Sequence, residues 1–99
     1  MNNEEYRNLK LAAKNFKTVC VSINDYNYVL NRFEVASDVN YLSIKYYGSD
    51  IIMDNQLEDG YIQVSNKELF LKLKTIDSGI SQPIKLNDFD RVLELKAFW

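Results

Sequence analysis

The sequence predicts an α+β fold in which an N-terminal helix packs on a mostly antiparallel β-sheet, a meander, with one or two further helical segments toward the C-terminus. Three observations lead to this prediction. Apolar residues near the N-terminus recur with helical spacing, the alternation then changes to a period of two, and helix-capping signals return late in the chain. The chain has 99 residues, and we expect one domain over 1–99 because a second would be too small to bury its own core.

Residues 3–17 have the pattern of an amphipathic helix. An asparagine at position 2 or 3 can cap it, and acids in its first turn and lysines in its last turn complement the helix dipole. The apolar residues that share one face are Tyr6, Leu9, Ala13 and Phe16.

The stretch TVCVSIN, residues 18–24, changes to strand-like alternation. Val19, Val21 and Ile23 fall on one side, and small or β-branched residues fall on the other, which predicts a strand. Cys20 lies on this strand and is interpreted as a small, half-buried residue. It is the only cysteine of the chain, so it has no intrachain disulfide partner.

Three segments fit both a helix and a strand. Residues 26–35 contain aromatic and β-branched residues after an Asn-Asp pair typical of a turn, which favours a second strand. Residues 68–76 follow a Ser-x-x-Glu capping box and precede a glycine, which favours a helix. Residues 88–98 begin at a capping residue and share an apolar face, but a final strand fits them equally.

Residues 40–66 have the pattern of an antiparallel meander. Gly48-Ser49 interrupts one strand-like run, and Glu58-Asp59-Gly60 precedes another. Asp-Gly between two such runs is a strong short-range hairpin signal. The alternation places Tyr46 on the side of Ile44, toward the core, and Tyr47 on the opposite side.

Missing residue types exclude many activities. The chain has no histidine, which removes Ser-His-Asp and Cys-His nucleophile pairs and every zinc site that contains histidine. One cysteine excludes thiolate zinc sites and iron–sulfur clusters, and three widely spaced glycines exclude a glycine-rich phosphate loop. The stretch DNQLEDG resembles a calcium loop, but its oxygen ligands do not alternate as such a loop requires. We therefore expect no enzymatic activity, no cofactor and no metal.

Charge and hydropathy set further expectations. The net charge of −2 is against a dedicated nucleic-acid binder but leaves room for a local basic patch. There is no signal-peptide pattern and no apolar run of the roughly 20 residues that span a bilayer. The lack of both patterns, together with a single cysteine, indicates a cytoplasmic protein with no membrane partner. Frequent Asn, Lys, Ile and Tyr, which have AT-rich codons, point to a low-GC bacterium, its phages or its mobile elements.

The negative charge is concentrated in one part of the chain. Residues 46–66 contain four acids and no lysine or arginine, so that segment is net −4 and the rest is net +2. Acids steer a basic partner toward a surface, and tyrosines supply contact area once it has docked. The simpler interpretation is that turns need acids and strands favour tyrosine. The predicted partner-binding residues are Tyr47, Asp50, Asp54, Glu58, Asp59 and Tyr61.

These observations favour a small non-enzymatic protein that binds another protein with a basic surface, as an inhibitor or adaptor would. Its size resembles that of phage proteins that block host enzymes, which is an analogy only. The last element, which ends in Phe98 and Trp99, is expected to dock back on the domain. The alternative is that these two aromatic residues anchor a partner or a second copy of the chain. The alternative function is binding of a small molecule or nucleotide in a pocket lined by Tyr26, Tyr28 and Tyr41.

Overall fold

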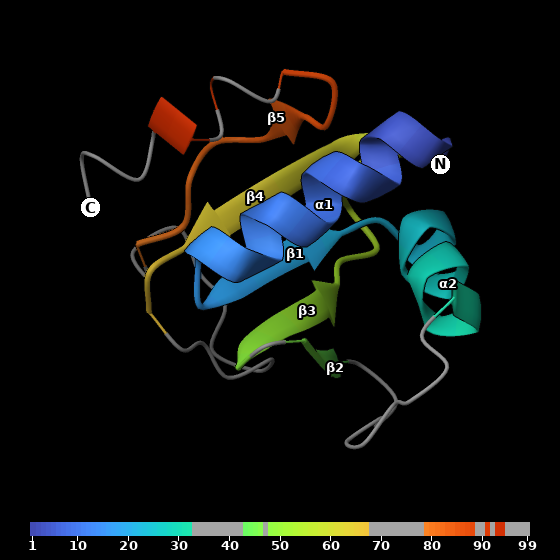
Figure 1. Cartoon of the computed structure of the whole chain (residues 1–99), viewed down its shortest axis with the longest axis horizontal. Coiled ribbons are helices and arrows are strands. Elements are labelled where there is room, and N and C mark those ends of the chain that lie inside the picture. The colour runs from blue at the N-terminus through green and yellow to red at the C-terminus, as the bar shows by residue number, and fades with distance from the viewer. Residues whose placement is uncertain (33–42, 47, 68–78, 89–90, 92, 95–99) are drawn as a thin grey trace.

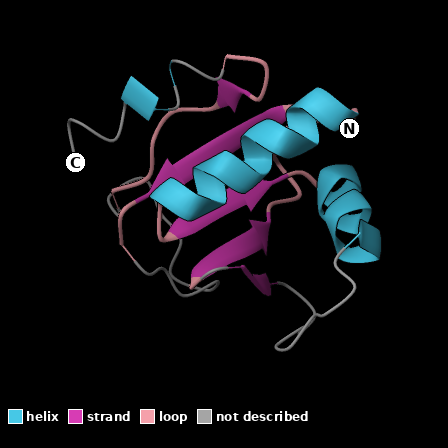
Figure 2. Cartoon of the chain, viewed as in Figure 1, coloured by secondary structure: helices cyan, strands magenta, loops and turns pink. Residues whose placement is uncertain are grey.

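A mixed β-sheet with a helix across one face forms the described part of the fold (Figure 1). The computed structural model describes residues 1–32, 43–46, 48–67, 79–88, 91, 93 and 94. Helices and strands both contribute substantially, which confirms the α+β class (Figure 2). The elements among these residues are α1 (Asn3–Asn15), β1 (Thr18–Val21), α2 (Ile23–Arg32), β2 (Ser43–Tyr46), β3 (Ser49–Met53), β4 (Tyr61–Ser65) and β5 (Ile84–Lys85).

The strands are ordered β2-β3-β1-β4-β5. β2 and β3 form the expected antiparallel hairpin, and β4 is antiparallel to both β1 and β5. The expected meander is wrong beyond that hairpin, because β1 lies between β3 and β4 and pairs with β3 in parallel. The Asp-Gly signal at positions 59–60 therefore marks a turn into β4 rather than a hairpin between neighbouring strands. The sheet is mixed.

α1 confirms the expected N-terminal helix and its cap. The Asn2 side chain accepts a 2.8 Å hydrogen bond from the Glu5 backbone N–H, and Glu5 Oε1 accepts one of 3.0 Å from the Asn2 N–H. The helix ends two residues earlier than the predicted position 17, because Phe16 is extended (φ −127°, ψ 152°) and leads directly into β1. Its N–H still bonds the Ala12 carbonyl at 2.9 Å, which closes the last turn.

The hydrophobic core lies between α1, α2 and one face of the sheet. All four residues of β1, the central strand, are buried. Cys20 is one of them, so it is a small packed residue as expected, but it is fully buried rather than half-buried. The core residues are Leu9, Ala12, Ala13, Phe16, Val19, Val21, Tyr26, Val29, Ile44, Ile51, Ile62, Val64, Ile84 and Leu86.

The strand expected at 26–35 is wrong up to residue 32, because residues 23–32 form α2. The strand expected at 18–24 is also too long, because β1 ends at Val21 and Ile23 begins the helix. The Ser22 hydroxyl accepts a 3.1 Å hydrogen bond from the Asp25 backbone N–H, which is the geometry of a helix N-cap. Tyr26 and Val29, three residues apart, are buried on one helix face. The N-cap and the packing of Tyr26 and Val29 stabilise a short helix here. They override the strand preference of its aromatic and β-branched residues.

The remaining secondary-structure predictions fall mainly on other parts of the chain. Residues 33–35 of the predicted strand, the predicted helix at 68–76 and most of the segment 88–98 lie outside the described residues. Within the described C-terminal part, the short strand β5 pairs with β4, a pairing that the sequence did not predict.

Candidate functional site

The loop before β4 and the segment around β5 meet at one end of the sheet. Tyr61, the first residue of β4, is aligned with Lys85 of β5. The Leu86 N–H donates a 2.8 Å hydrogen bond to the Gly60 carbonyl, which extends this pairing by one residue. Residues distant in sequence are therefore held side by side at the start of β4.

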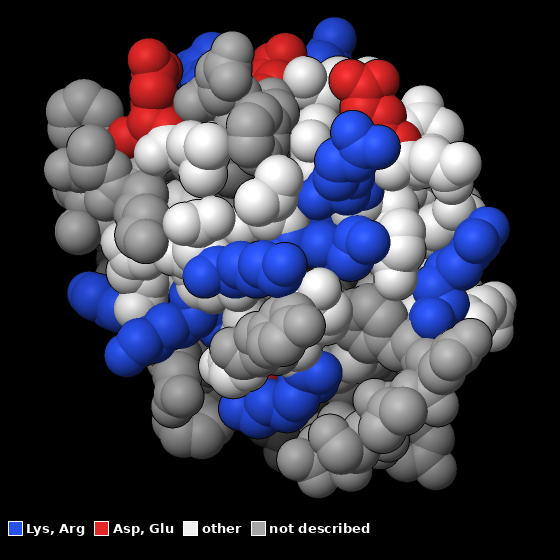
Figure 3. Space-filling model, in the orientation of Figure 1, with Lys and Arg blue, Asp and Glu red and all other residues white. Residues whose placement is uncertain are grey.

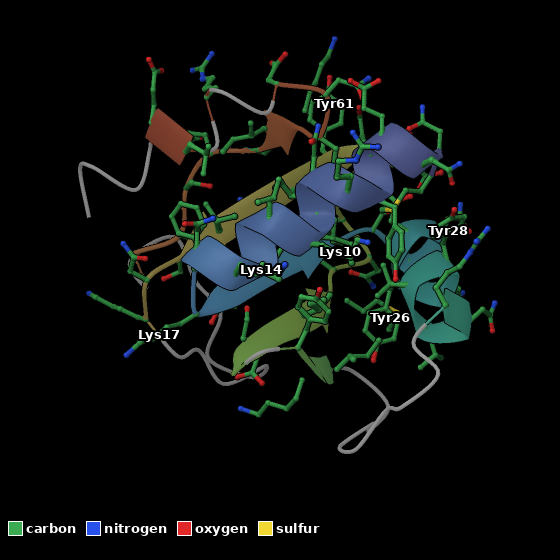
Figure 4. All side chains as sticks on the ribbon, viewed as in Figure 1. Lys10, Lys14, Lys17, Tyr26, Tyr28 and Tyr61 are labelled. Atoms are coloured by element: carbon green, nitrogen blue, oxygen red, sulfur yellow. The ribbon has the colours of Figure 1, made fainter. Side chains whose placement is uncertain are left out.

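Two open depressions flank Tyr61 and Pro83, which line both of them. One has a volume of about 340 Å³ and is otherwise lined by Gln56, Leu57 and Glu58. The other has a volume of about 310 Å³ and is otherwise lined by Ile84, Lys85, Asp88 and Arg91. In Figure 4, Tyr61 lies near β5 and apart from Tyr26 and Tyr28. We call this surface, consisting of Leu57, Glu58, Tyr61, Pro83 and Asp88, the Tyr61 edge.

The turn before Tyr61 is fixed from two sides. The buried Asp25 of α2 accepts a 2.7 Å hydrogen bond from the Gly60 N–H, while the Gly60 carbonyl is bonded by β5 as described above. Gly60 has φ +81°, a left-handed conformation that a side chain at this position would strain. The Tyr61 edge is therefore built on a braced turn, which favours a preformed surface.

Asp59 connects the same loop to the start of α2. Its carboxylate accepts hydrogen bonds from the Ser22 hydroxyl at 2.7 Å and from Asn24 Nδ2 at 3.0 Å. The hydrogen bonds from Asn24 and Ser22 lower the pKa of Asp59 below its ordinary value. The side chain is thus ionised at neutral pH and holds the loop in place, so its first role is structural.

Asp50 and Asp54 lie at opposite ends of β3. Asp50 is aligned with Thr18 at the start of β1, and Asp54 follows Met53, which is aligned with the last residue of β1. At about 3.3 Å per residue, the two positions are roughly 13 Å apart along the strand. The acidic segment expected from the sequence is therefore not gathered on one surface.

Each of these two acids has a local partner. Asp50 pairs with Lys45 of the neighbouring strand at 2.9 Å, which offsets its charge. Asp54 Oδ1 accepts a 3.0 Å hydrogen bond from the Gln56 N–H, an arrangement typical of aspartate in turns. Of the six predicted partner-binding residues, Glu58, Asp59 and Tyr61 come together, and Asp54 lies in the turn that leads to Glu58. Asp50 lies at the other end of β3, and Tyr47 is outside the described residues.

The tyrosines of the alternative ligand pocket have other surroundings. Tyr26 belongs to the hydrophobic core, and its burial raises the pKa of its hydroxyl. Tyr28 packs edge-on against Tyr6 with ring centroids 5.7 Å apart. Neither residue lines the two depressions at the Tyr61 edge, and Tyr41 is outside the described residues. No observation here favours a pocket formed by these three tyrosines.

Sequence reasoning missed Pro83 and Asp88 as members of the site. They come more than twenty positions after Tyr61 and reach it through the pairing of β4 with β5. β5 has only two residues, too few for alternation to be recognised. The one usable sign was Pro83, because proline marks a turn or the start of an edge strand.

The described residues include neither a metal-binding cluster nor a membrane-spanning helix. They contain no group of three or more metal-ligating side chains. None of the helices in this part of the chain is long and apolar enough to cross a membrane. In comparisons with known proteins, no family model, curated protein or solved structure matches the chain.

Proposed function

We propose that the protein acts by binding another protein through the Tyr61 edge. The observation that carries this proposal is the position of Tyr61 and Pro83 between two open depressions at a braced turn. Tyrosine is enriched at the centres of protein interfaces, because its ring gives a large contact area with few torsions to fix. Open depressions next to such a residue can accept side chains of a partner protein, whereas small molecules usually bind in more enclosed pockets.

The charges around Tyr61 indicate what the partner presents. Glu58 is exposed beside Leu57 in the first depression, so an apolar side chain can enter there while a lysine or arginine pairs with Glu58. The second depression has mixed charge, with Asp88 beside Lys85 and Arg91. The partner surface is therefore basic opposite Glu58 and polar opposite β5. An inhibitor or adaptor in the cytoplasm, which needs no reaction of its own, fits this surface.

Site-specific photo-crosslinking in host cells tests the proposal. A photoreactive amino acid is placed at Gln56, which is exposed and lines the first depression, and in a control protein at Asn31, which is exposed on α2. We expect one defined protein to be crosslinked from position 56 and not from position 31. Equal products from both positions, or none from position 56, would refute binding at the Tyr61 edge.

A further inference from the structure

A row of cations lies on the face of α1 that is turned away from the sheet. Arg7, Lys10 and Lys14 are three and four residues apart, so they fall on the same side of the helix, and Lys17 follows just after its end. Figure 4 shows Lys10, Lys14 and Lys17 following one another along α1 and into β1. We call these four residues the α1 stripe. Arg7, Lys14 and Lys17 are exposed, and Lys10 is partly exposed.

The acids of α1 precede the stripe. They are Glu4 and Glu5 in the first turn of the helix, where Glu5 takes part in the capping box. On the face shown in Figure 3, Lys and Arg side chains run across the middle, while the visible Asp and Glu side chains lie along the upper edge together with other Lys and Arg side chains. Within the described residues, a chain with a net charge of −2 thus has a locally positive row on α1. Such a patch attracts polyanions although the whole molecule does not.

The dimensions of the stripe match a phosphate backbone. At about 1.5 Å per residue, Arg7 to Lys14 spans roughly 10 Å of helix, and Lys17 lies beyond the helix, after the extended Phe16. One strand of a duplex carries a phosphate about every 3.4 Å along the axis, so the helical part of the stripe covers about three phosphates. The three cations of the helix therefore face about three phosphates, and Lys17 adds a fourth cation at the end of the row.

The surroundings of the stripe favour contacts with a phosphate backbone over base stacking or apolar anchoring. Lys10 Nζ lies over the Tyr6 ring, 4.7 Å from its centroid, and Arg32 lies over the Tyr28 ring at 4.5 Å. The two rings also contact each other, so they are engaged rather than open to stacking with unpaired bases. The apolar face of α1 is buried against the sheet, so the stripe has no apolar anchor of the kind that protein interfaces use. What remains is a linear array of positive charge.

We propose that the α1 stripe binds the phosphate backbone of duplex nucleic acid without reading its sequence. This site is separate from the Tyr61 edge and does not depend on the function proposed for that edge. With both sites, the protein would hold a bound partner protein near nucleic acid.

The salt dependence of binding to a duplex tests this proposal. The probe is a fluorescently labelled DNA duplex of about 20 base pairs, and the association constant is measured by anisotropy at several salt concentrations. Four phosphate contacts predict a slope of about −3.6 in a plot of log association constant against log salt concentration. Affinity should then fall on the order of 100-fold between about 50 and 200 mM salt.

Two double variants with the same change in net charge localise the binding. Lys10→Gln with Lys14→Gln removes two cations from the stripe, and Lys85→Gln with Arg91→Gln removes two at β5 and beyond it. The first pair should reduce the magnitude of the slope by about 1.8 and weaken binding, while the second leaves both nearly unchanged. Thermal melting of each variant shows that the fold is intact.

Three results would overturn the proposal. The first is no binding to the duplex at low salt, and the second is an equal loss in both double variants. The third is binding of the wild type to anionic lipid vesicles or to an acidic peptide but not to the duplex. In that case the stripe recognises another polyanion.

Discussion

The Ser22 hydroxyl donates a 2.7 Å hydrogen bond to Asp59 Oδ1 and accepts one from the Asp25 N–H at 3.1 Å. One side chain thus caps α2 and holds the loop that leads into β4. The carboxylate of Asp25, in the first turn of α2, accepts a hydrogen bond from the Gly60 N–H. The start of α2 is therefore the brace on which the turn before Tyr61 is built.

The stability supplied by Asp59 should depend on pH. Because the hydrogen bonds from Asn24 and Ser22 lower its pKa in the folded protein, the ionised form is stabilised by folding. This contribution is fully present above the pKa of the unfolded chain and is lost as pH falls through the lower folded pKa. Asp59→Asn should therefore melt at a lower temperature than wild type at pH 7, and the difference should shrink as the pH falls below about 4, the ordinary aspartate pKa of the unfolded chain. A difference that is constant with pH would show that the carboxylate charge is not involved.

Ser22→Ala should destabilise the protein by about 1 kcal/mol, because the α2 N-cap is lost, and urea denaturation measures this change. The hydroxyl also bonds Asp59, so the losses from Ser22→Ala and Asp59→Asn should be less than additive in the double variant. Full additivity would indicate that the 2.7 Å hydrogen bond contributes nothing to stability.

Gly60→Ala should cost more stability than Gly48→Ala, although both glycines have positive φ angles of about 80°. Both substitutions pay the strain of a left-handed alanine, roughly 1 kcal/mol or more. At Gly60 the new Cβ would also lie 3.2 Å from Glu5 Oε2, whereas at Gly48 nothing lies within 4 Å. Equal midpoints in urea for the two variants would show that Glu5 gives way without cost.

Leu9→Ala should be among the most damaging core substitutions, with a loss of about 2–5 kcal/mol. Leu9 is fully buried between α1 and the sheet, so the substitution leaves a cavity in the core. Ile23→Ala is the control, because Ile23 is 42% exposed at the start of α2 and should change stability little. A similar loss for both variants, measured by urea denaturation, would contradict this placement of the core.

The sequence predicts an element correctly where its local signals, such as apolar spacing, caps and charge, all favour the same structure. α1 has periodic apolar residues, a cap and dipole-matched charges, and β1 has a clear alternation in which every residue proved buried. The strand prediction for α2 is wrong because aromatic and β-branched residues favour a strand locally. Ser22 and Asp25 form the Ser-x-x-Asp signal of a helix start, and this is the local signal in the sequence that favours the helix.

Long-range pairing accounts for the other errors. Alternation identifies a strand but does not say which strand is its neighbour, so the insertion of β1 between β3 and β4 could not be read from residues 40–66. The same limit applies to the site. Glu58 and Tyr61 were found from local charge and composition, whereas Pro83 and Asp88 join them only through a two-residue strand.

Tyr61 is proposed to anchor a protein partner, and the most direct test is the affinity of the partner that is crosslinked from position 56. Its Kd is measured by titration calorimetry for wild type, for Tyr61→Ala and for the control Asp50→Asn. Asp50 lies at the opposite end of the sheet from Tyr61. A central aromatic anchor contributes about 2 kcal/mol or more, so Tyr61→Ala should raise Kd by about 30-fold or more. Asp50→Asn should leave it nearly unchanged. An unchanged Kd for a folded Tyr61→Ala protein would contradict the account.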